Sequence, residues 1–168
     1  MFYLYLLIAL ALLVAAIFLS PLRAKVWVSF AAIVAAALAV AVPSIATLAG
    51  GDAIQMASSI HSVVDTGALA IDSLSAIFLL IIGIAGIATV LYSRGYLAHY
   101  LGKKSSAHIS LHYTALVLLV VSMMLVVMAD GGFLFLFAWE LMTIASFILI
   151  LFDAERPEVL RAALAYLV

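Results

Sequence analysis

An acidic residue inside an apolar run is the strongest chemical feature of this sequence. Glu140 is the one ionisable group in the twenty residues from Phe133 to Phe152. As a helix, this run is about 30 Å long, which matches the hydrocarbon core of a bilayer, and the carboxyl group lies about 10 Å from one end. A carboxylate at that depth costs about 3 kcal/mol, which the surrounding apolar residues offset. Glu140 must therefore find a polar partner or hold a proton.

We interpret Glu140 as a group of a proton or ion pathway, because acids inside membrane spans are rare and usually functional. The alternative is an acid that only hydrogen-bonds a neighbouring helix. Thr143, one turn further along, is a weaker candidate on the same helix face. His112 is another weaker candidate, for proton entry, since histidine titrates near neutral pH. The alternative for His112 is a residue that only packs at the membrane interface.

Other kinds of chemistry find no support in the residue pattern. The chain has no cysteine, which excludes disulfides, thiolate metal sites and iron–sulfur ligation on this chain. Its four histidines and eight acids form no recognised metal motif, and no glycine-rich phosphate loop is present. We predict no catalytic residue, no metal site, no cofactor and no nucleic-acid partner.

The composition is that of an integral membrane protein. The 168 residues are 70% hydrophobic and 9% charged, with a mean hydropathy of +1.41. In soluble domains about a quarter of residues are charged. We therefore expect an all-α, polytopic transmembrane helix bundle in a cell (plasma or inner) membrane.

The apolar runs predict five full spans and the start of a sixth helix. The spans are expected at about 2–19, 26–49, 73–92, 112–129 and 133–152, with the sixth helix starting near Glu158. The polar stretches at about 50–72 and 93–111 are expected to be connecting loops. On these bounds no lysine lies inside a span, so the partner of Glu140 must come from elsewhere.

The basic residues predict the orientation. All seven fall in alternate connections, namely Arg23 and Lys25, then Arg94, Lys103 and Lys104, then Arg156 and Arg161. By the positive-inside rule these connections are cytoplasmic and the N-terminus is external. The loop at about 50–72 is then external and the loop at about 93–111 is cytoplasmic.

Three stretches resemble a known family. LAIDSLSAIFLLIIGIAG at Leu69–Gly86, LYSRGYL at Leu91–Leu97 and FAWELMTIASFILILFDAE at Phe137–Glu155 are similar to the N-terminal part of the antiporter-like membrane subunits of complex I, Mrp-type cation/proton antiporters and membrane-bound hydrogenases. The sequence of the third stretch is most similar to the large membrane subunit of hydrogenase 4 and formate hydrogenlyase. The first two spans match in hydropathy alone.

The resemblance implies two inverted five-helix repeats that carry protons along buried lysines, a histidine and one glutamate. Residues 1–111 would hold three lead helices, and residues 112–168 would begin the first repeat, truncated in the sixth helix of the chain. The family's fifth-helix glutamate maps onto Glu140, where it is thought to pair with a lysine on the seventh helix. That helix is absent here, so we expect a fragment of a longer subunit or a split subunit completed by another chain.

The expected function is proton translocation as a non-redox membrane subunit of a hydrogenase-type or NADH:quinone oxidoreductase-like complex. Its partners would be other membrane and peripheral subunits, the lipid bilayer and protons. One alternative is a subunit of a multisubunit Na⁺/H⁺ antiporter, with Na⁺ as the second ion. Another is a truncated copy that serves only in assembly or has no function.

Overall fold

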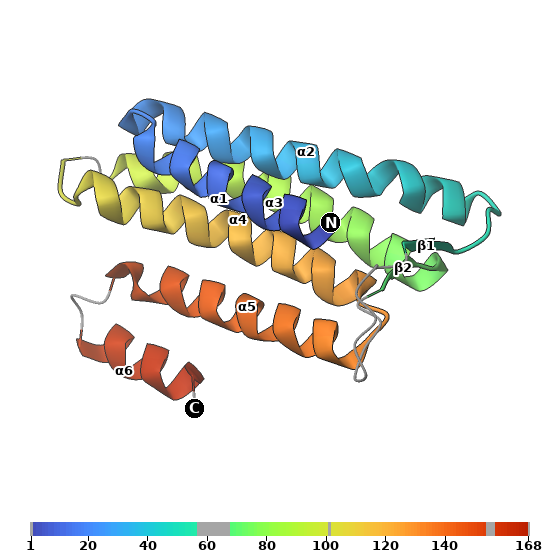
Figure 1. Ribbon diagram of the computed structural model, residues 1–168. Helices are drawn as coiled ribbons and strands as arrows, with labels where there is room; N and C mark the ends of the chain where they lie inside the picture. Colours follow the sequence, from blue (N-terminus) through green and yellow to red (C-terminus); the bar gives the residue numbers. More distant parts are fainter. Residues whose placement is uncertain (1, 57–67, 101, 154–156, 168) are drawn as a thin grey trace.

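The computed structural model describes residues 2–56, 68–100, 102–153 and 157–167. The elements are, in order, the helices α1 (Phe2–Leu19) and α2 (Leu22–Leu48), the strands β1 (Ile54–Met56) and β2 (Leu69–Ile71), the helices α3 (Ser73–Ala98), α4 (Ser106–Met128) and α5 (Gly132–Ile150), the short 3₁₀ turn η1 (Leu151–Asp153), and α6 (Pro157–Leu167) (Figure 1). Residues 57–67 of the expected external loop, and Arg156, lie outside the described residues.

Four of the described helices, α2 to α5, are long and apolar enough to cross a membrane. This supports the expected all-α membrane bundle. The expected first span corresponds to α1, which forms a helix at the predicted position, but its crossing of the membrane stays a prediction. The external N-terminus and the cytoplasmic side of the basic loops likewise stay predictions.

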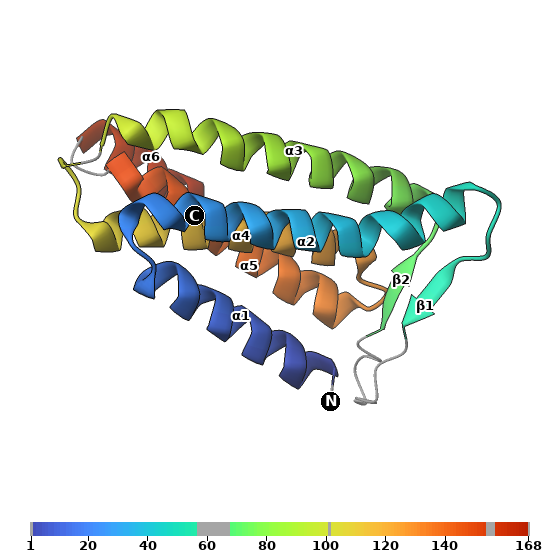
Figure 2. The same cartoon turned by 90° about the horizontal axis from the view of Figure 1, so that it is seen from above.

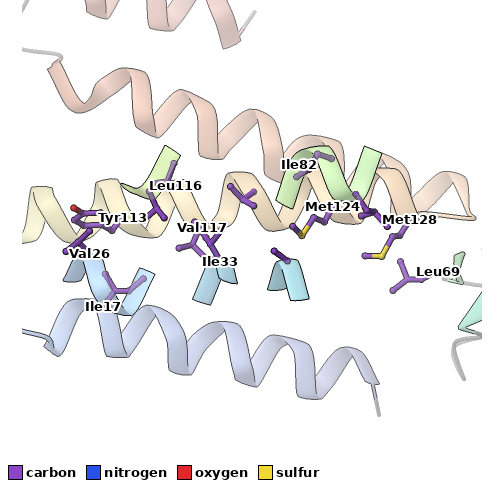
Figure 3. Close-up of a cluster of buried hydrophobic side chains, with 14 of the residues drawn as sticks. Ile17, Val26, Ile33, Leu69, Ile82, Tyr113, Leu116, Val117, Met124 and Met128 are labelled. Carbon is purple, nitrogen blue, oxygen red and sulfur yellow. The ribbon is translucent and has the colours of Figure 1, made fainter. Parts of the chain in front are cut away.

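Helices α2, α3 and α4 pack against one another, with α1 beside α2 and α4, and α5 on α4 (Figures 1 and 2). Side chains from several of these helices and from β2 fill the core; those labelled in Figure 3 include Ile17, Val26, Ile33, Leu69, Tyr113, Val117 and Met124. A glycine in α3 lets α2 and α4 approach that helix closely. A Cβ atom at Gly86 of α3 would lie 2.9 Å from Val120 Cγ1 of α4 and 3.2 Å from Ile33 Cγ2 of α2.

A small hairpin closes one end of the bundle. Strands β1 and β2 pair antiparallel, and the backbone N–H of Asp130 donates to the carbonyl oxygen of Ala68 at 3.1 Å. This bond attaches the hairpin to the turn between α4 and α5. Asp72 then caps α3, because its carboxylate accepts a hydrogen bond from the Ser75 N–H at 2.7 Å.

The connection between α3 and α4 is shorter than the sequence suggested. It covers residues 99–105, whereas a polar loop was expected over about 93–111. Helix α3 continues because Ser93 and Leu97 are buried while Arg94 lies on the exposed side. Helix α4 begins early because the Ser105 hydroxyl caps it, accepting a hydrogen bond from the His108 N–H at 3.3 Å. The expectation for this loop was therefore wrong in extent.

Lys25 also departs from expectation, because α2 starts at Leu22 and not near Val26. Its side chain is fully buried, and Nζ donates to the carbonyl oxygens of Ile17 at 2.8 Å and Phe18 at 3.2 Å. Lys25 therefore lies in the first turn of a helix that is long and apolar enough to cross a membrane, whereas it was expected in the connection before that helix. That no lysine lies inside the membrane itself stays a prediction. Lys25 nevertheless uses its donors on the last turn of α1, so it does not supply the partner for Glu140.

Candidate functional site

Glu140 lies near the middle of α5 and faces away from the helix on which α5 packs. The buried residues of α5 are Leu134, Ala138 and Ala145, which share one side. At about 100° per residue, Glu140 lies about 200° around the helix from Ala138. Its side chain is exposed in the described chain. Glu140 is thus directed to a side of α5 that α4 leaves uncovered.

The surroundings of Glu140 on this side are apolar. Phe133, Leu136 and Ile144 are 67%, 62% and 49% exposed, and they lie within about 40° of Glu140 around the helix. Among residues 2–56, 68–100, 102–153 and 157–167, no basic side chain forms an ion pair with Glu140. The described residues therefore present a carboxyl group within an apolar helix face and leave it without a cation.

Thr143 lies on the same side of α5, about 60° from Glu140. It is partly buried, and its hydroxyl donates to the carbonyl oxygen of Trp139 at 3.1 Å. The Ser146 hydroxyl in turn donates to the Thr143 carbonyl oxygen at 2.9 Å. Because the Thr143 proton is used within α5, its hydroxyl oxygen is available to a neighbour mainly as an acceptor.

His112 lies in α4, partly buried in an aromatic cluster formed by Tyr96, Tyr113 and Phe152. The centroid of its ring is 4.8 Å from that of Phe152, 5.8 Å from that of Tyr113 and 6.4 Å from that of Tyr96. Its Nδ1 atom is buried and has no hydrogen-bond partner in the described part of the chain. A buried ring nitrogen of this kind needs a water molecule or a further side chain.

The structure brings Glu140 and Thr143 together but places His112 elsewhere. The ring of His112 packs on Phe152, which follows Glu140 by about 18 Å along α5 and η1 at the rise of an α-helix. A direct proton transfer between the two groups is excluded at that separation. His112 and Glu140 could be linked only through intervening groups or water.

Two lysines whose contacts join separate elements were not predicted. Lys104 donates from Nζ to the carbonyl oxygen of Phe152 at 3.0 Å and lies 5.4 Å from the centre of its ring, which joins the α3–α4 connection to η1. Lys25 joins α1 to α2. A sequence signal existed for Lys25 alone: Pro21 favours a helix start directly after it, which places Lys25 in the first turn. Within the described ranges, no cluster of histidine and acidic residues is arranged to hold a metal ion.

The described residues form a helical bundle in which four helices, α2 to α5, are long and apolar enough to cross a membrane, which indicates a multi-pass α-helical membrane protein. Residues 59–105 match the family model described as NADH-Ubiquinone oxidoreductase (complex I), chain 5 N-terminus. A search of curated proteins found no match. The matched segment covers less than half of the chain and includes α3, so the resemblance to proton-antiporter-like membrane subunits is supported there, while α5 and Glu140 lie outside it.

Proposed function

We propose that this chain is a proton-translocating, antiporter-like membrane subunit, or the N-terminal part of one, and that Glu140 is an acid of its proton pathway. The observation that carries the proposal is the position of Glu140 near the middle of α5, on the side that α4 leaves uncovered. The match of residues 59–105 to the N-terminus of complex I chain 5 supports the class of protein.

The proposed partner of Glu140 is a lysine on a helix outside these residues, either later in a longer chain or in another subunit. An ionised carboxylate in hydrocarbon is costly unless a cation or hydrogen-bond donors compensate it. Transfer of a proton to Glu140 would weaken the ion pair with that lysine, and its release would restore the pair. Such an exchange couples a proton step to the position of a neighbouring helix.

His112 would belong to the end of the pathway near the basic connections. Its Nδ1 has no partner among the described residues, and Lys104 lies beside the same Phe152 ring. Water at this end would satisfy Nδ1 and could bring a proton to the bundle. Thr143 would contribute as an acceptor beside Glu140, one turn closer to Phe152.

The finer assignment is to a hydrogenase-type or NADH:quinone oxidoreductase-like complex, in which redox chemistry takes place on other subunits of the cell membrane assembly. The sequence around Trp139 and Glu140 favours the hydrogenase 4 and formate hydrogenlyase branch of the antiporter-like subunits. Co-purification from the native membrane tests this assignment. Hydrogenase or quinone-reducing subunits would support it, whereas recovery with small antiporter subunits alone would favour Na⁺/H⁺ exchange.

The test of function is Glu140→Gln in the native complex, with Asp130→Asn as the matched control. Asp130 is exposed, and it attaches to Ala68 through its backbone, so its amide variant preserves that contact. We expect proton uptake by membrane vesicles to fall about a hundredfold in the Glu140 variant, as for loss of a positioned proton-transfer group. Assembly should be unchanged. Unaltered proton uptake in a fully assembled Glu140→Gln complex would remove Glu140 from the pathway.

A further inference from the structure

An arginine and a tryptophan meet on the outer surface of the bundle, where α3 ends and α2 begins. The guanidinium carbon of Arg94 lies 5.6 Å from the centre of the Trp27 ring. Trp27 is 53% exposed, and Arg94 is also exposed. Helices α2 and α3 run side by side, so this contact joins two elements at the end of the bundle that carries the basic connections (Figures 1 and 2).

A second guanidinium lies on the same side of α2. Arg23 precedes Trp27 by four residues, which places both on one face of the helix, and Arg23 is exposed. Neither arginine forms an ion pair with a carboxylate in the part of the chain that the structure describes. The surface formed by Arg23, Trp27 and Arg94, here called the Arg–Trp surface, therefore carries two positive charges beside an exposed indole.

The stacked geometry leaves the arginine able to bind an anion. A cation–π contact uses the flat face of the guanidinium, whereas its N–H donors point outward in the plane of the group. Planar, paired N–H donors match the oxygens of a phosphate. Arg94 can therefore hold a phosphate while it remains in contact with Trp27, and Arg23 adds a second charge nearby.

The apolar surface next to these residues indicates which phosphate compound binds. On α3, Leu91 and Ile84 precede Arg94 by three and ten residues, and they are 51% and 72% exposed. On α2, Leu38 follows Trp27 by eleven residues, and it is 61% exposed. At about 100° per residue, Leu38 lies about 20° around α2 from Trp27, and Leu91 and Ile84 lie about 60° and 80° around α3 from Arg94, within about 20° of each other. These exposed apolar side chains lead from the Arg–Trp surface toward the middle of the two helices. A bound molecule thus meets hydrogen-bond donors at one end and apolar side chains along its length. Tryptophan is typical of the interface between the hydrocarbon core of a bilayer and the water.

We propose that the Arg–Trp surface binds the phosphate headgroup of an anionic phospholipid, with the acyl chains lying along α2 and α3. Basic residues beside membrane-spanning helices bind anionic lipids, each contributing about 1 kcal/mol, which is about a fivefold change in affinity. The proposal is independent of Glu140, since it concerns a different face and a different ligand.

The test is native mass spectrometry of the full chain in detergent, titrated with phosphatidylglycerol or with phosphatidylcholine of the same acyl chains. The double variant Arg23→Gln/Arg94→Gln should bind phosphatidylglycerol about 25-fold more weakly, with binding of phosphatidylcholine little changed. Arg94→Lys should also weaken binding of phosphatidylglycerol, because a lysine keeps the charge but loses the planar donors. Arg161→Gln, which removes an exposed charge from α6, is the matched control and should bind as the original chain does.

The proposal fails if the double variant binds phosphatidylglycerol as tightly as the original chain, which would leave the surface to a protein partner. It also fails if Arg161→Gln weakens binding as much, because the effect would then be one of net charge. Equal affinity of the original chain for the two lipids would likewise contradict a phosphate site that selects anionic headgroups.

Discussion

The Lys25 ammonium donates a hydrogen bond to the carbonyl oxygen of Ile17 at 2.8 Å and thereby ties the first turn of α2 to the last turn of α1. A second bond reaches the carbonyl oxygen of Phe18 at 3.2 Å. The last carbonyl groups of a helix have no partner within it, and positive charge is favourable at that end. Lys25 therefore stabilises the end of α1 and fixes its approach to α2.

Replacing Lys25 by methionine should destabilise the contact between α1 and α2. The substitution keeps a long apolar chain but leaves carbonyl groups at the end of α1 without their donor, at a cost of about 1 to 3 kcal/mol. Thermal unfolding in detergent measures the loss. Lys103→Met, which removes an exposed lysine, is the control and should have little effect. Equal melting temperatures for the two variants would show that the Lys25 bonds contribute nothing.

Gly86 should not tolerate a side chain, whereas Gly95 in the same helix should. A Cβ atom at Gly86 would lie 2.9 Å from Val120 Cγ1, but a Cβ atom at Gly95 meets nothing within 4 Å. Gly86→Ala should therefore destabilise the bundle by about 1 to 3 kcal/mol. Gly95→Ala should leave stability unchanged or raise it by up to about 1 kcal/mol.

Adding Val120→Ala to the Gly86 variant provides a specific check, since it removes the methyl groups that the new Cβ would meet. Unfolding in detergent should show recovery of part of the lost stability. If the double variant is less stable than the original chain by the full sum of the two single effects, the two positions are independent and the contact is not the cause.

Asp72 should make the stability of α3 depend on acid pH. The backbone N–H of Ser75 donates to its carboxylate and lowers the pKa of Asp72 below the ordinary value. The folded state therefore holds its proton less tightly than the unfolded state does. The stability that this cap contributes is fully present above the unfolded pKa, about 3.9, and is lost as the pH falls through the lower folded value.

Asp72→Asn separates the charge of this cap from its hydrogen bond. Asparagine also caps helices, so the variant should remain folded at neutral pH. Its melting temperature should fall less steeply than that of the original chain as the pH drops below about 4. The same acid dependence in both proteins would assign it to other carboxyl groups.

His112→Phe should lower proton uptake less than Glu140→Gln does. Phenylalanine preserves the ring contact with Phe152, while the unpaired Nδ1 atom is removed. A role in bringing protons to the bundle predicts slower uptake with unchanged assembly. If uptake is unchanged over the range of pH in which histidine titrates, His112 serves only to pack against the aromatic cluster.

The sequence predicted the helices well because each apolar run is bounded by a local signal. Asp72 provides a cap before α3, and α6 begins at Pro157, next to the expected start near Glu158. The length of the α3–α4 connection was not predicted, because Arg94 and His108 make the stretch polar while lying on exposed helix sides. Whether a polar residue ends a helix or lies on its outer face depends on packing against other helices, which a single sequence does not show.

For the candidate site, the sequence predicted the residues but not their packing against other helices. Glu140 is visible because its surroundings are apolar, and Thr143 follows from helical spacing. The side of α5 that faces α4 depends on Ala138 and Ala145, two small residues among many. The contact between His112 and Phe152 joins positions far apart in the chain, and the burial of Lys25 depends on where α1 ends.

The central claim is that Glu140 takes up and releases a proton during turnover. Infrared difference spectroscopy of the working complex in membranes measures this directly, through the carbonyl stretching band of a protonated carboxyl group. We predict a band that changes on turnover, shifts on carboxyl ¹³C labelling, and is lost in Glu140→Gln but retained in Asp130→Asn. The same band in Glu140→Gln as in the original complex would contradict the proposed role of Glu140.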